Sequence, residues 1–386
     1  MATGDTVLVL THHDLRSVLD AREVSVLDAV RRAYVLHSQG ATAVPRPAVL
    51  NPPEEFRELV ARPAFLGGTK PAAGVAWQAS AADDGEGGPA LSAATIILNS
   101  AVTGRPEALL EGSLITARRT AAGAALAASA LGTGEDAAGV TLVGCGAVGF
   151  ETLRYLHVVH PDLLEVTVHD LRRERAGAFA ARVARELPTL RVRFEPDRAR
   201  ALAAASLVVL STRAAAPWLD TRRLRPGTLV LHTSLRDVTP ESVLAAVNVV
   251  DDAEHACRAD GSLALAERLS GNRSFLTANL GDLLLAGTTG VRDPRRTTIF
   301  SPAGLGVLDL AVARYARDRA EQAGLGVRID DFLPARPAVL PGRADPFAGA
   351  GEPRPDRAGP PRVEGSPVDH PAGAAIVDRV TPAVPA

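Results

Sequence analysis

The sequence has 386 residues, enough for one large or two ordinary domains, and 46% of them are hydrophobic, which is ample for buried cores. Lysine and arginine (42) nearly balance aspartate and glutamate (44), so the charge points neither to a nucleic-acid partner nor to a membrane surface. The cysteines, Cys145 and Cys257, are too few for a disulfide framework and show no zinc-binding pattern, so we expect no metal. There is no apolar run of about 18 residues and no visible signal peptide, so we expect no membrane span and a cytoplasmic location.

The first 111 residues predict a mixed α+β region. Short apolar runs predict strands, and an amphipathic period predicts helices, the first of them with Thr11 as its N-cap. The acidic, glycine-rich stretch 81–89 is expected to be a loop. We expect strands at 6–10, 56–65, 74–79, 93–99 and 106–110, an extended segment at 44–50, and helices through residue 19 and at 23–38.

From residue 113 onward, helices and strands alternate. An alanine-rich helix at 113–131 carries Arg118, Arg119 and Thr120 near its start and is expected to connect the two halves of the chain. The alternation predicts an α/β fold with a Rossmann-type, doubly wound parallel sheet, in which ligands bind beyond the carboxyl ends of the strands. We expect strands at 140–143, 164–169, 191–194, 207–210, 228–232, 247–250 and 297–300, and helices at 150–159, 172–186, 198–205, 279–286 and 306–322.

The first strand of this series runs into a glycine turn with the pattern G-x-G-x-x-G, formed by Gly144, Gly146 and Gly149. The spacing suits a tight turn, a close approach of the backbone to a pyrophosphate, and close packing of the following helix. Asp170, about 20 residues further on at the end of the next strand, is positioned to bind ribose hydroxyls. The pattern predicts a dinucleotide site, and the alternative is a glycine-rich turn that binds no nucleotide.

Polar residues also follow the other strands, so we expect them at the same edge of the sheet. Asp237 is the strongest candidate for chemistry, because a carboxylate beside a nicotinamide can transfer protons at an amine or imine. The alternative is that Asp237 caps the helix that starts near Pro240. The remaining residues expected to contact the cofactor are Ala147, Val148, Ser211, Thr212, Ser234 and Leu235.

Arg119, near the start of the connecting helix, and Arg46, in the extended segment, are candidates for holding a substrate carboxylate. The alternative for each is a solvated surface arginine. Arg118 lies about 100° from Arg119 around the helix, so only one of the two is expected to face the site. His232 and His255 show no spacing to carboxylates that suggests a metal, and we expect His232 to be a core or supporting residue.

The segment Leu-Ile-Thr-Ala-Arg-Arg-Thr-Ala-Ala at 114–122, followed by the glycine turn, resembles the ornithine cyclodeaminase/mu-crystallin superfamily, and the resemblance covers about residues 6–325. Further stretches are similar to its 2,3-diaminopropionate synthase branch, which serves siderophore and peptide-antibiotic pathways. They are Ala-Thr-Ile-Ile-Leu-Asn at 94–99, Leu-His-Thr-Ser-Leu-Arg-Asp at 231–237, Asn-Val-Val-Asp-Asp at 248–252 and the segment 298–309.

The resemblance implies a homodimeric, two-domain subunit that uses NAD to act on an amino acid. A substrate-binding and dimerisation domain (1–119 plus 306–332) would carry an inserted NAD-binding domain (120–305). It further implies that Asp237 is the catalytic aspartate, that Arg119 and Arg46 bind carboxylates, and that Thr120 approaches the cofactor phosphates. Residues 333–386 are expected to be a disordered tail, because they are rich in Pro, Ala, Gly, Arg and Asp and show no periodicity.

One position departs from the branch, which usually carries a lysine that contacts the substrate in the pattern G-[VIM]-K-W. The corresponding stretch is Gly-Val-Ala-Trp at 74–77, so Ala76 stands in place of the lysine. Lys70, the only lysine in the chain, lies six residues earlier. It either reaches the substrate from a shifted loop or is solvated. Because loss of a buried cation weakens the binding of a carboxylate, either the substrate differs or the activity is reduced.

The branch predicts NAD-dependent oxidative cleavage of N-(2-amino-2-carboxyethyl)-L-glutamate to 2,3-diaminopropionate and 2-oxoglutarate. The carboxylates of this substrate suit a pocket lined by arginines. Asp170 favours NAD over NADP, because a carboxylate repels a 2′-phosphate, although Arg172 and Arg173 weaken this preference. The alternatives are an ornithine cyclodeaminase, a related alanine dehydrogenase or ketimine reductase, and a non-catalytic, mu-crystallin-like cofactor binder.

Overall fold

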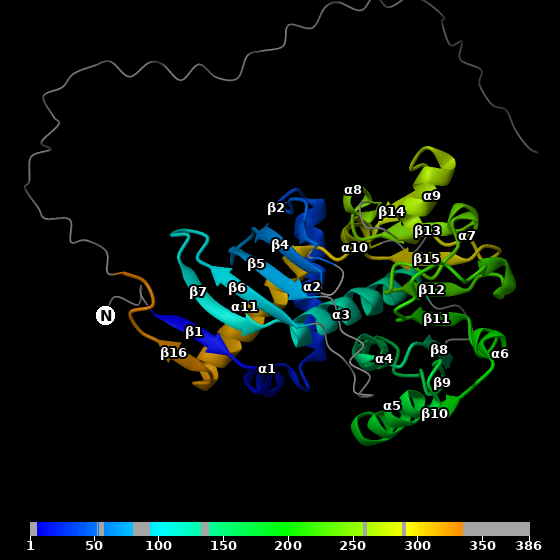
Figure 1. The fold of residues 1–386 in the computed structure, drawn as a ribbon, viewed down its shortest axis with the longest axis horizontal. Coiled ribbons are helices and arrows are strands. Elements are labelled where there is room, and N and C mark those ends of the chain that lie inside the picture. The colour runs from blue at the N-terminus through cyan, green and yellow to red at the C-terminus, as the bar shows by residue number, and fades with distance from the viewer. Residues whose placement is uncertain are drawn as a thin grey trace, which may run out of the picture. The chain divides into compact units, whose positions relative to one another are not determined.

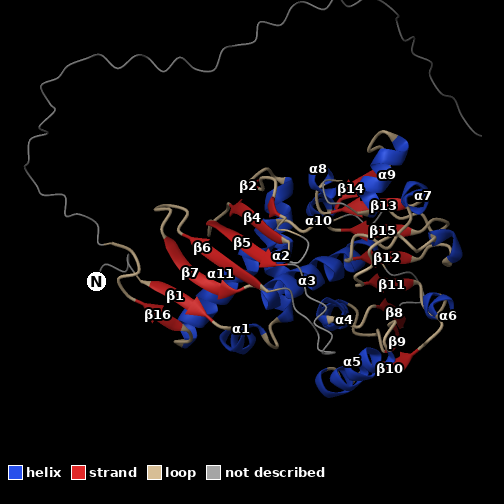
Figure 2. Ribbon diagram, viewed as in Figure 1, coloured by secondary structure: helices blue, strands red, loops and turns tan. Residues whose placement is uncertain are grey.

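Two eight-stranded sheets organise the chain (Figure 1, Figure 2). The computed structural model describes residues 6–51, 53, 58–79, 93–132, 139–257, 261–287 and 291–334. All of these residues belong to one compact unit, Met1–Ala335.

The first sheet is built from the N-terminal part of the chain and one late strand. Its strands are β1 (Val7–Leu10), β2 (Thr42–Ala43), β3 (Ala48–Leu50), β4 (Leu59–Leu66), β5 (Ala72–Ala79), β6 (Ala94–Asn99), β7 (Pro106–Glu111) and β16 (Val327–Ile329). They follow the order β16-β1-β7-β6-β5-β4-β2, and β3 also pairs with β4. The strands pair antiparallel except for β1 and β7, which run parallel.

In the part of the chain that the structure describes, the helices that pack on the first sheet cover one of its faces (Figure 1). Its inner face packs against α11 (Gly306–Ala323), which also contacts α1 (His12–Leu19) and α2 (Glu23–Ser38). Gly74 lets the helix come close, because a Cβ at this position would lie 3.0 Å from Leu310 Cδ2. Alternate side chains point to the other face, where Phe65 and Trp77 are exposed.

The second sheet is entirely parallel. Its strands are β8 (Gly139–Val143), β9 (Glu165–His169), β10 (Arg191–Phe194), β11 (Leu207–Leu210), β12 (Leu229–His232), β13 (Val247–Val250), β14 (Leu276–Asn279) and β15 (Thr298–Ser301). The order is β10-β9-β8-β11-β12-β15-β13-β14. The direction of winding therefore reverses between β8 and β11, and such a switch point is where doubly wound sheets bind their ligands.

The helices of this half alternate with the strands. They are α4 (Ala147–Val159), α5 (Arg173–Glu186), α6 (Arg198–Leu202), α7 (Pro240–Ala245), α8 (Ala253–Ala256), α9 (Ser262–Ser270) and α10 (Leu280–Ala286), with a short 3-10 turn at Thr221–Arg223.

Helix α3 (Ser113–Leu131) links the two sheets and is buried along most of its length. Its small alanine and glycine residues let α2 and α4 pack closely on it. At Gly123, for example, a Cβ would lie 2.9 Å from the hydroxyl oxygen of Tyr34. Within the described ranges, no helix combines the length and the apolar character needed to cross a membrane.

The structure confirms the predicted α/β class and the doubly wound parallel sheet. Helix α4 starts at Ala147, three residues before its predicted start, because the helix begins directly after Gly146 of the turn. Strands β14 and β16 and helix α9 were not predicted. Both strands are short and lie at sheet edges, so they carry no long apolar run. The predicted loop at 81–89 and all but the first residues of the predicted tail lie outside the described residues.

Candidate active site

The glycine turn after β8 has the geometry that its spacing predicts. Gly144 has a φ of +97°, and a Cβ there would lie 2.2 Å from the carbonyl oxygen of Ser211. Gly149 lets α4 approach the turn, because a Cβ there would lie 2.8 Å from the carbonyl oxygen of Gly144. Among the described residues, no atom lies within 4 Å of the Cβ position of Gly146, so the backbone is open where a pyrophosphate would approach.

The start of α4 is open to an anion. Its N-cap, Gly146, makes no side-chain cap, so the first N–H groups of this 13-residue helix, including those of Ala147 and Val148, are available. Burial raises the pKa of the Cys145 thiol to about 12, which suits a packing residue rather than a redox thiol.

Asp170 is fixed against the glycine turn. It directly follows β9, the neighbour of β8, and its Oδ2 accepts a hydrogen bond of 2.9 Å from the backbone N–H of Cys145. Its Oδ1 accepts one of 2.9 Å from the backbone N–H of Arg172. This is the position of the ribose-binding acid in dinucleotide sites. The turn, the open helix start and Asp170 together fit a bound dinucleotide.

Asp237 is fully buried in the turn after β12. Its Oδ1 accepts hydrogen bonds from the hydroxyl of Thr212 and from the indole N–H of Trp218, the latter at 2.7 Å. Its Oδ2 accepts one from the hydroxyl of Ser234. Leu235 of the same turn has a φ of +67°, an uncommon conformation for a residue other than glycine.

These contacts keep Asp237 ionised. Burial alone raises its pKa, but the neighbouring His232 and the bonds from Ser234 and Thr212 outweigh it, so the pKa lies below the ordinary aspartate value. His232 Nε2 lies 3.2 Å from the backbone nitrogen of Asp237 and 3.5 Å from its Oδ2, and His232 Nδ1 lies 3.0 Å from the hydroxyl oxygen of Ser301. His232 is thus a buried supporting residue, as the sequence indicated.

Arg119 is buried on α3 and is held by a single carboxylate. Its Nε lies 3.0 Å from Oδ1 of Asp309 on α11, and the same oxygen accepts the hydroxyl of Thr116 at 2.9 Å. The terminal nitrogens lie against the loop before α11, because a Cβ on Gly304 would be 3.0 Å from Nη1 and 3.1 Å from Nη2. No other described carboxylate is within ion-pairing distance of Arg119, so Nη1 and Nη2 can take a carboxylate from a ligand.

The loop before α11 places Arg119 at the carboxyl edge of the second sheet. Asp251, which follows β13, accepts the backbone N–H groups of Ala303 at 2.9 Å and Gly304 at 2.7 Å, in the loop after β15. Burial raises the pKa of Asp251, although these bonds and the nearby Arg119 oppose the rise. Because Gly304 also touches Arg119, the guanidinium lies at the strand ends where doubly wound sheets bind ligands.

The segment of Arg46 is tied to the same edge. The carbonyl oxygen of Val44 accepts a hydrogen bond of 3.0 Å from His255 Nε2. The other ring nitrogen of His255 lies 2.8 Å from the carboxylate of Asp252, just after β13. The structure thus brings the segment of Arg46 and Arg119 to neighbouring strand ends, while the side chain of Arg46 itself is exposed.

Lys70 is not brought to this cluster. Its side chain is 73% exposed, and its Nζ lies 3.6 Å from Asp318 on α11. Asp318 is nine residues beyond Asp309, which corresponds to about 13 Å along the helix. Thr120 donates its hydroxyl to the carbonyl oxygen of Thr116 at 2.8 Å, within α3.

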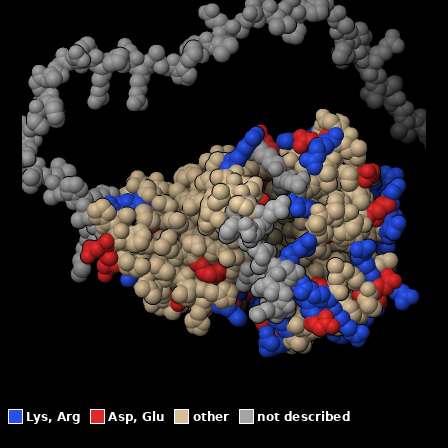
Figure 3. Space-filling view, viewed as in Figure 1, with Lys and Arg blue, Asp and Glu red and all other residues tan. Residues whose placement is uncertain are grey.

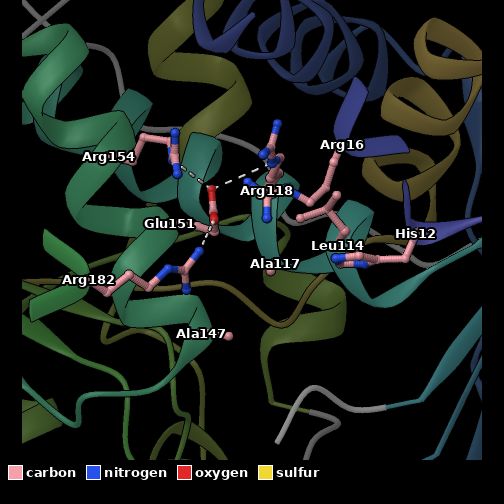
Figure 4. Close-up of a pocket in the computed structure, with 9 residues that line it drawn as sticks. All are labelled: His12, Arg16, Leu114, Ala117, Arg118, Ala147, Glu151, Arg154 and Arg182. Atoms are coloured by element: carbon pink, nitrogen blue, oxygen red, sulfur yellow. Dashed lines mark ion pairs between the residues drawn. The ribbon is translucent and has the colours of Figure 1, made fainter. Parts of the chain in front are cut away.

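A pocket of about 190 Å³ lies between α3 and α4, and its lining includes Arg118 and also Ala147 at the start of α4 (Figure 4). Glu151 of α4 occupies its centre, with Oε2 at 3.6 Å from Arg118 Nε and at 3.3 Å from Arg154 Nε, and with Oε1 at 3.5 Å from Arg182 Nη2. Figure 4 shows the three guanidinium groups around this carboxylate. As the helical spacing predicts, Arg118 and Arg119 point to different partners.

Two residues of the site were not singled out from the sequence. Asp309 is a lone acid in a buried, otherwise apolar segment, and a buried charge needs a partner, so its position was a usable signal. Trp218 gave no such signal, because only the fold brings it to Asp237. In the part of the chain that the structure describes, no group of three or more His, Cys, Asp and Glu side chains is arranged to hold a metal ion.

Known proteins share this architecture. The model of the ornithine cyclodeaminase/mu-crystallin family matches residues 7–324. N-((2S)-2-amino-2-carboxyethyl)-L-glutamate dehydrogenase of Staphylococcus aureus is 25% identical over 333 residues, which are 84% of this chain and 98% of that protein. Alanine dehydrogenase of Archaeoglobus fulgidus is 26% identical over 331 residues, again 84% and 98% of the two chains.

A solved structure of similar fold is that of an archaeal alanine dehydrogenase dimer with bound NAD. It superimposes with a TM-score of 0.75 at 25% identity and covers 84% of this chain and 99% of its own.

Proposed function

The chain belongs to the ornithine cyclodeaminase/mu-crystallin family, a family of NAD(P)-dependent oxidoreductases that act on amino acids, and we propose that it cleaves N-(2-amino-2-carboxyethyl)-L-glutamate oxidatively. The products are 2,3-diaminopropionate and 2-oxoglutarate, precursors for a siderophore or a peptide antibiotic. The observation that carries the proposal is Arg119, whose buried guanidinium is bonded through Nε alone and keeps two donors for a substrate carboxylate. The likeness to the S. aureus enzyme along 98% of its length supports this choice of substrate.

The overall change consumes one water molecule and transfers two electrons. Bound NAD⁺ would supply the chemistry of a hydride acceptor for the hydrogen on the glutamate Cα. The secondary amine of the substrate thereby becomes an imine, water adds to its carbon, and the C–N bond breaks as the carbinolamine collapses to 2-oxoglutarate and the free amine. The overall reaction also releases one proton.

The residues of the chain hold the substrate and move protons in this scheme. Arg119 holds the carboxylate next to the reacting carbon, and Arg46 holds a second one from its edge segment. Asp237 is ionised and accepts the proton of the attacking water, relayed by the hydroxyl of Ser234 that is bonded to its Oδ2. Thr212 and Trp218 hold the carboxylate in place.

The cofactor in this proposal is NAD. Gly146, Ala147 and Val148 would hold its pyrophosphate at the open start of α4, Thr120 would approach the phosphates, and Asp170 would hold its adenosine ribose. Because Asp170 keeps a carboxylate at this position, a 2′-phosphate is repelled.

The subunit is proposed to form a homodimer through the outer face of the first sheet, defined here by the exposed residues Leu50, Phe65 and Trp77 and the half-buried Val75, Ile97 and Leu109. Figure 3 shows few charged side chains over this sheet, in contrast to the many around the second sheet. An exposed apolar face of this kind is typical of an interface. The similar archaeal alanine dehydrogenase is a dimer.

The test is turnover by the purified chain with NAD⁺ and N-(2-amino-2-carboxyethyl)-L-glutamate, followed by NADH absorbance and by detection of 2-oxoglutarate. Alanine and ornithine serve as parallel substrates, because alanine dehydrogenase of A. fulgidus is similar to this chain over the same share of its length. Turnover of either one, together with inertness toward the proposed substrate, would replace the proposal by that activity. No turnover of any of them, with NAD binding intact, would leave a non-catalytic cofactor binder.

A further inference from the structure

A second arginine, Arg62, lies opposite the position where the family branch carries its lysine. Strands β4 and β5 pair antiparallel, and their register places Arg62 directly across from Ala76. Directly opposed residues point to the same face of the sheet, with their Cβ atoms about 5 Å apart. Ala76 is buried, so both residues face inward, toward α11 rather than toward solvent.

The surroundings of Arg62 place it beside the Arg119 cluster. A Cβ on Gly306, the first residue of α11, would lie 3.5 Å from the Cβ of Arg62. Gly306 is two residues after Gly304, against which the terminal nitrogens of Arg119 lie. Burial lowers the pKa of Arg62, and the charge of Arg119 lowers it further, while Asp309 and Glu58 raise it. Two guanidinium groups therefore share one region of the inner face.

Arg62 and a lysine at position 76 exclude one another. Like charges directly opposite each other in an antiparallel pair are destabilising. The small side chain of Ala76 leaves room for the long side chain of Arg62, whose Nη1 donates to Gln78 Oε1 at 2.7 Å further along β5. The remaining guanidinium N–H groups are in position for a ligand.

We propose that Arg62 determines substrate specificity by binding the side-chain carboxylate of the glutamate part of the substrate, while Arg119 binds the carboxylate next to the reacting carbon. The substrate class is thus an amino acid with at least two carboxylates. This proposal rests on the proposed function, because it assigns one of the carboxylates of that substrate. In this proposal Arg62 supplies the cation that Ala76 does not.

The binding test uses the holoenzyme with NADH and compares 2-oxoglutarate with 2-oxopentanoate, which has the same chain length but lacks the second carboxylate. The dissociation constants are measured by calorimetry for the wild type and for Arg62→Met, with Arg31→Met, an exposed arginine on α2, as the matched control. Loss of a charged hydrogen bond predicts weaker 2-oxoglutarate binding by about tenfold to a hundredfold in Arg62→Met. Binding of 2-oxopentanoate and of NADH stays unchanged in all variants.

The expected repulsion between Arg62 and a lysine at position 76 can be tested by a second set of binding measurements. Ala76→Lys in the wild type is expected to weaken 2-oxoglutarate binding, and the same substitution in Arg62→Met is expected to restore it. Arg62→Lys keeps the charge and is expected to keep the preference for 2-oxoglutarate in reduced form. NADH binding reports whether each variant is folded, so a variant that binds NADH gives an interpretable result.

The outcomes separate this inference from the proposed function. If Arg62→Met binds 2-oxoglutarate as the wild type does, the inference is overturned, even where the proposed substrate is turned over. If the wild type does not turn over that substrate, but its preference for 2-oxoglutarate depends on Arg62, the inference stands and the proposed function fails.

Discussion

Asp170 and Asp237 have the same side chain in different surroundings. Asp170 is half-buried and accepts two backbone N–H groups, so its charge stays at the rim of the proposed ribose site. Asp237 is fully buried and accepts three side-chain donors. The first residue can select the cofactor through its charge, and the second can take part in proton transfer.

Removing the charge of Asp170 is expected to relax the choice between NAD and NADP. In Asp170→Ser, the ratio of kcat/KM for NAD to that for NADP should fall by about tenfold or more, since juxtaposed like charges cost several kcal/mol. Steady-state kinetics with both cofactors measure the ratio. Glu174→Ser, which removes an exposed acid in the first turn of α5, is the control and should leave it unchanged. An unaltered ratio in Asp170→Ser would contradict the assignment of this residue.

Asp237→Asn is expected to abolish turnover and to change the pH dependence of stability. The folded pKa of Asp237 lies below its ordinary value, so its stabilising contribution is present above that value and is lost as the pH falls through the folded pKa. Urea unfolding at several pH values should therefore show the variant less stable at neutral pH, with a gap to the wild type that narrows in the acid range. Asp28→Asn, at an exposed pair, is the control. A gap independent of pH would contradict the pKa assignment.

At the scale of elements, the contact between α3 and α4 is held by charge as well as by small apolar residues. Glu151 balances arginines from three helices, Arg118 of α3, Arg154 of α4 and Arg182 of α5. Arg182 also lies over the ring of Phe150, with its guanidinium carbon 3.5 Å from the ring centre. Burial makes such a network sensitive to the loss of any one partner.

Removing Glu151 should cost far more stability than removing an exposed acid. Glu151→Ala removes the most deeply buried carboxylate of the network, while Arg118 keeps Asp20 and Arg154 and Arg182 keep Glu186, and it is expected to lower the free energy of unfolding by about 3 kcal/mol. Glu165→Ala breaks an exposed pair with Arg191, in which the side chains are 57% and 69% exposed, and should cost less than about 1 kcal/mol. Urea denaturation of both variants measures the difference, and equal losses would show that the network contributes little.

Elements with a strong local signal could be predicted from the sequence. The apolar period of α2 and the alanine-rich run of α3 give both helices within their observed bounds, and the capping box of Thr11 and Asp14 marks the start of α1. The glycine turn predicts its own geometry, because a Cβ at Gly144 or Gly149 would collide with the backbone. Short edge strands such as β14 and β16 carry no comparable signal.

The candidate site was only partly predictable, because its contacts join distant parts of the chain. Arg119 and Asp309 are 190 positions apart, and no local pattern pairs them. The opposition of Arg62 and Ala76 depends on the register of a strand pair, which the sequence does not display. Lys70 was a candidate for the missing cation because it lies six residues before Ala76 in the sequence. The structure instead pairs Lys70 with Asp318 at the surface.

At the scale of the whole molecule, no helix among the described residues covers the outer face of the first sheet. The inner face is packed by α11, while the opposite face carries exposed apolar side chains such as Trp77, 42% exposed, and Phe65, 39% exposed. Charged residues gather instead around the second sheet (Figure 3). This asymmetry separates the proposed assembly surface from the proposed nucleotide site.

Charges placed on the outer face are expected to break the proposed dimer. The double variant with Phe65→Glu and Trp77→Glu should elute as a monomer, while the wild type elutes as a dimer, because buried carboxylates would face each other across a C2 interface. Size-exclusion chromatography with light scattering measures the mass. Val102→Glu, at a 91% exposed turn residue, is the control and should remain dimeric. A dimeric double variant would place the interface elsewhere.

Adjacent residues of α3 serve two halves of the molecule, since Arg118 reaches Glu151 behind the glycine turn and Arg119 reaches Asp309 beside the proposed substrate site. A rigid helix cannot move one guanidinium without the other, so we expect the affinities for the two ligands to be thermodynamically linked. Linkage is reciprocal, and the factor by which NAD tightens amino-acid binding must equal the factor by which the amino acid tightens NAD binding. The total free energy of binding both ligands is then the same whichever ligand binds first. A substitution that weakens the packing of α3 should lower both factors equally.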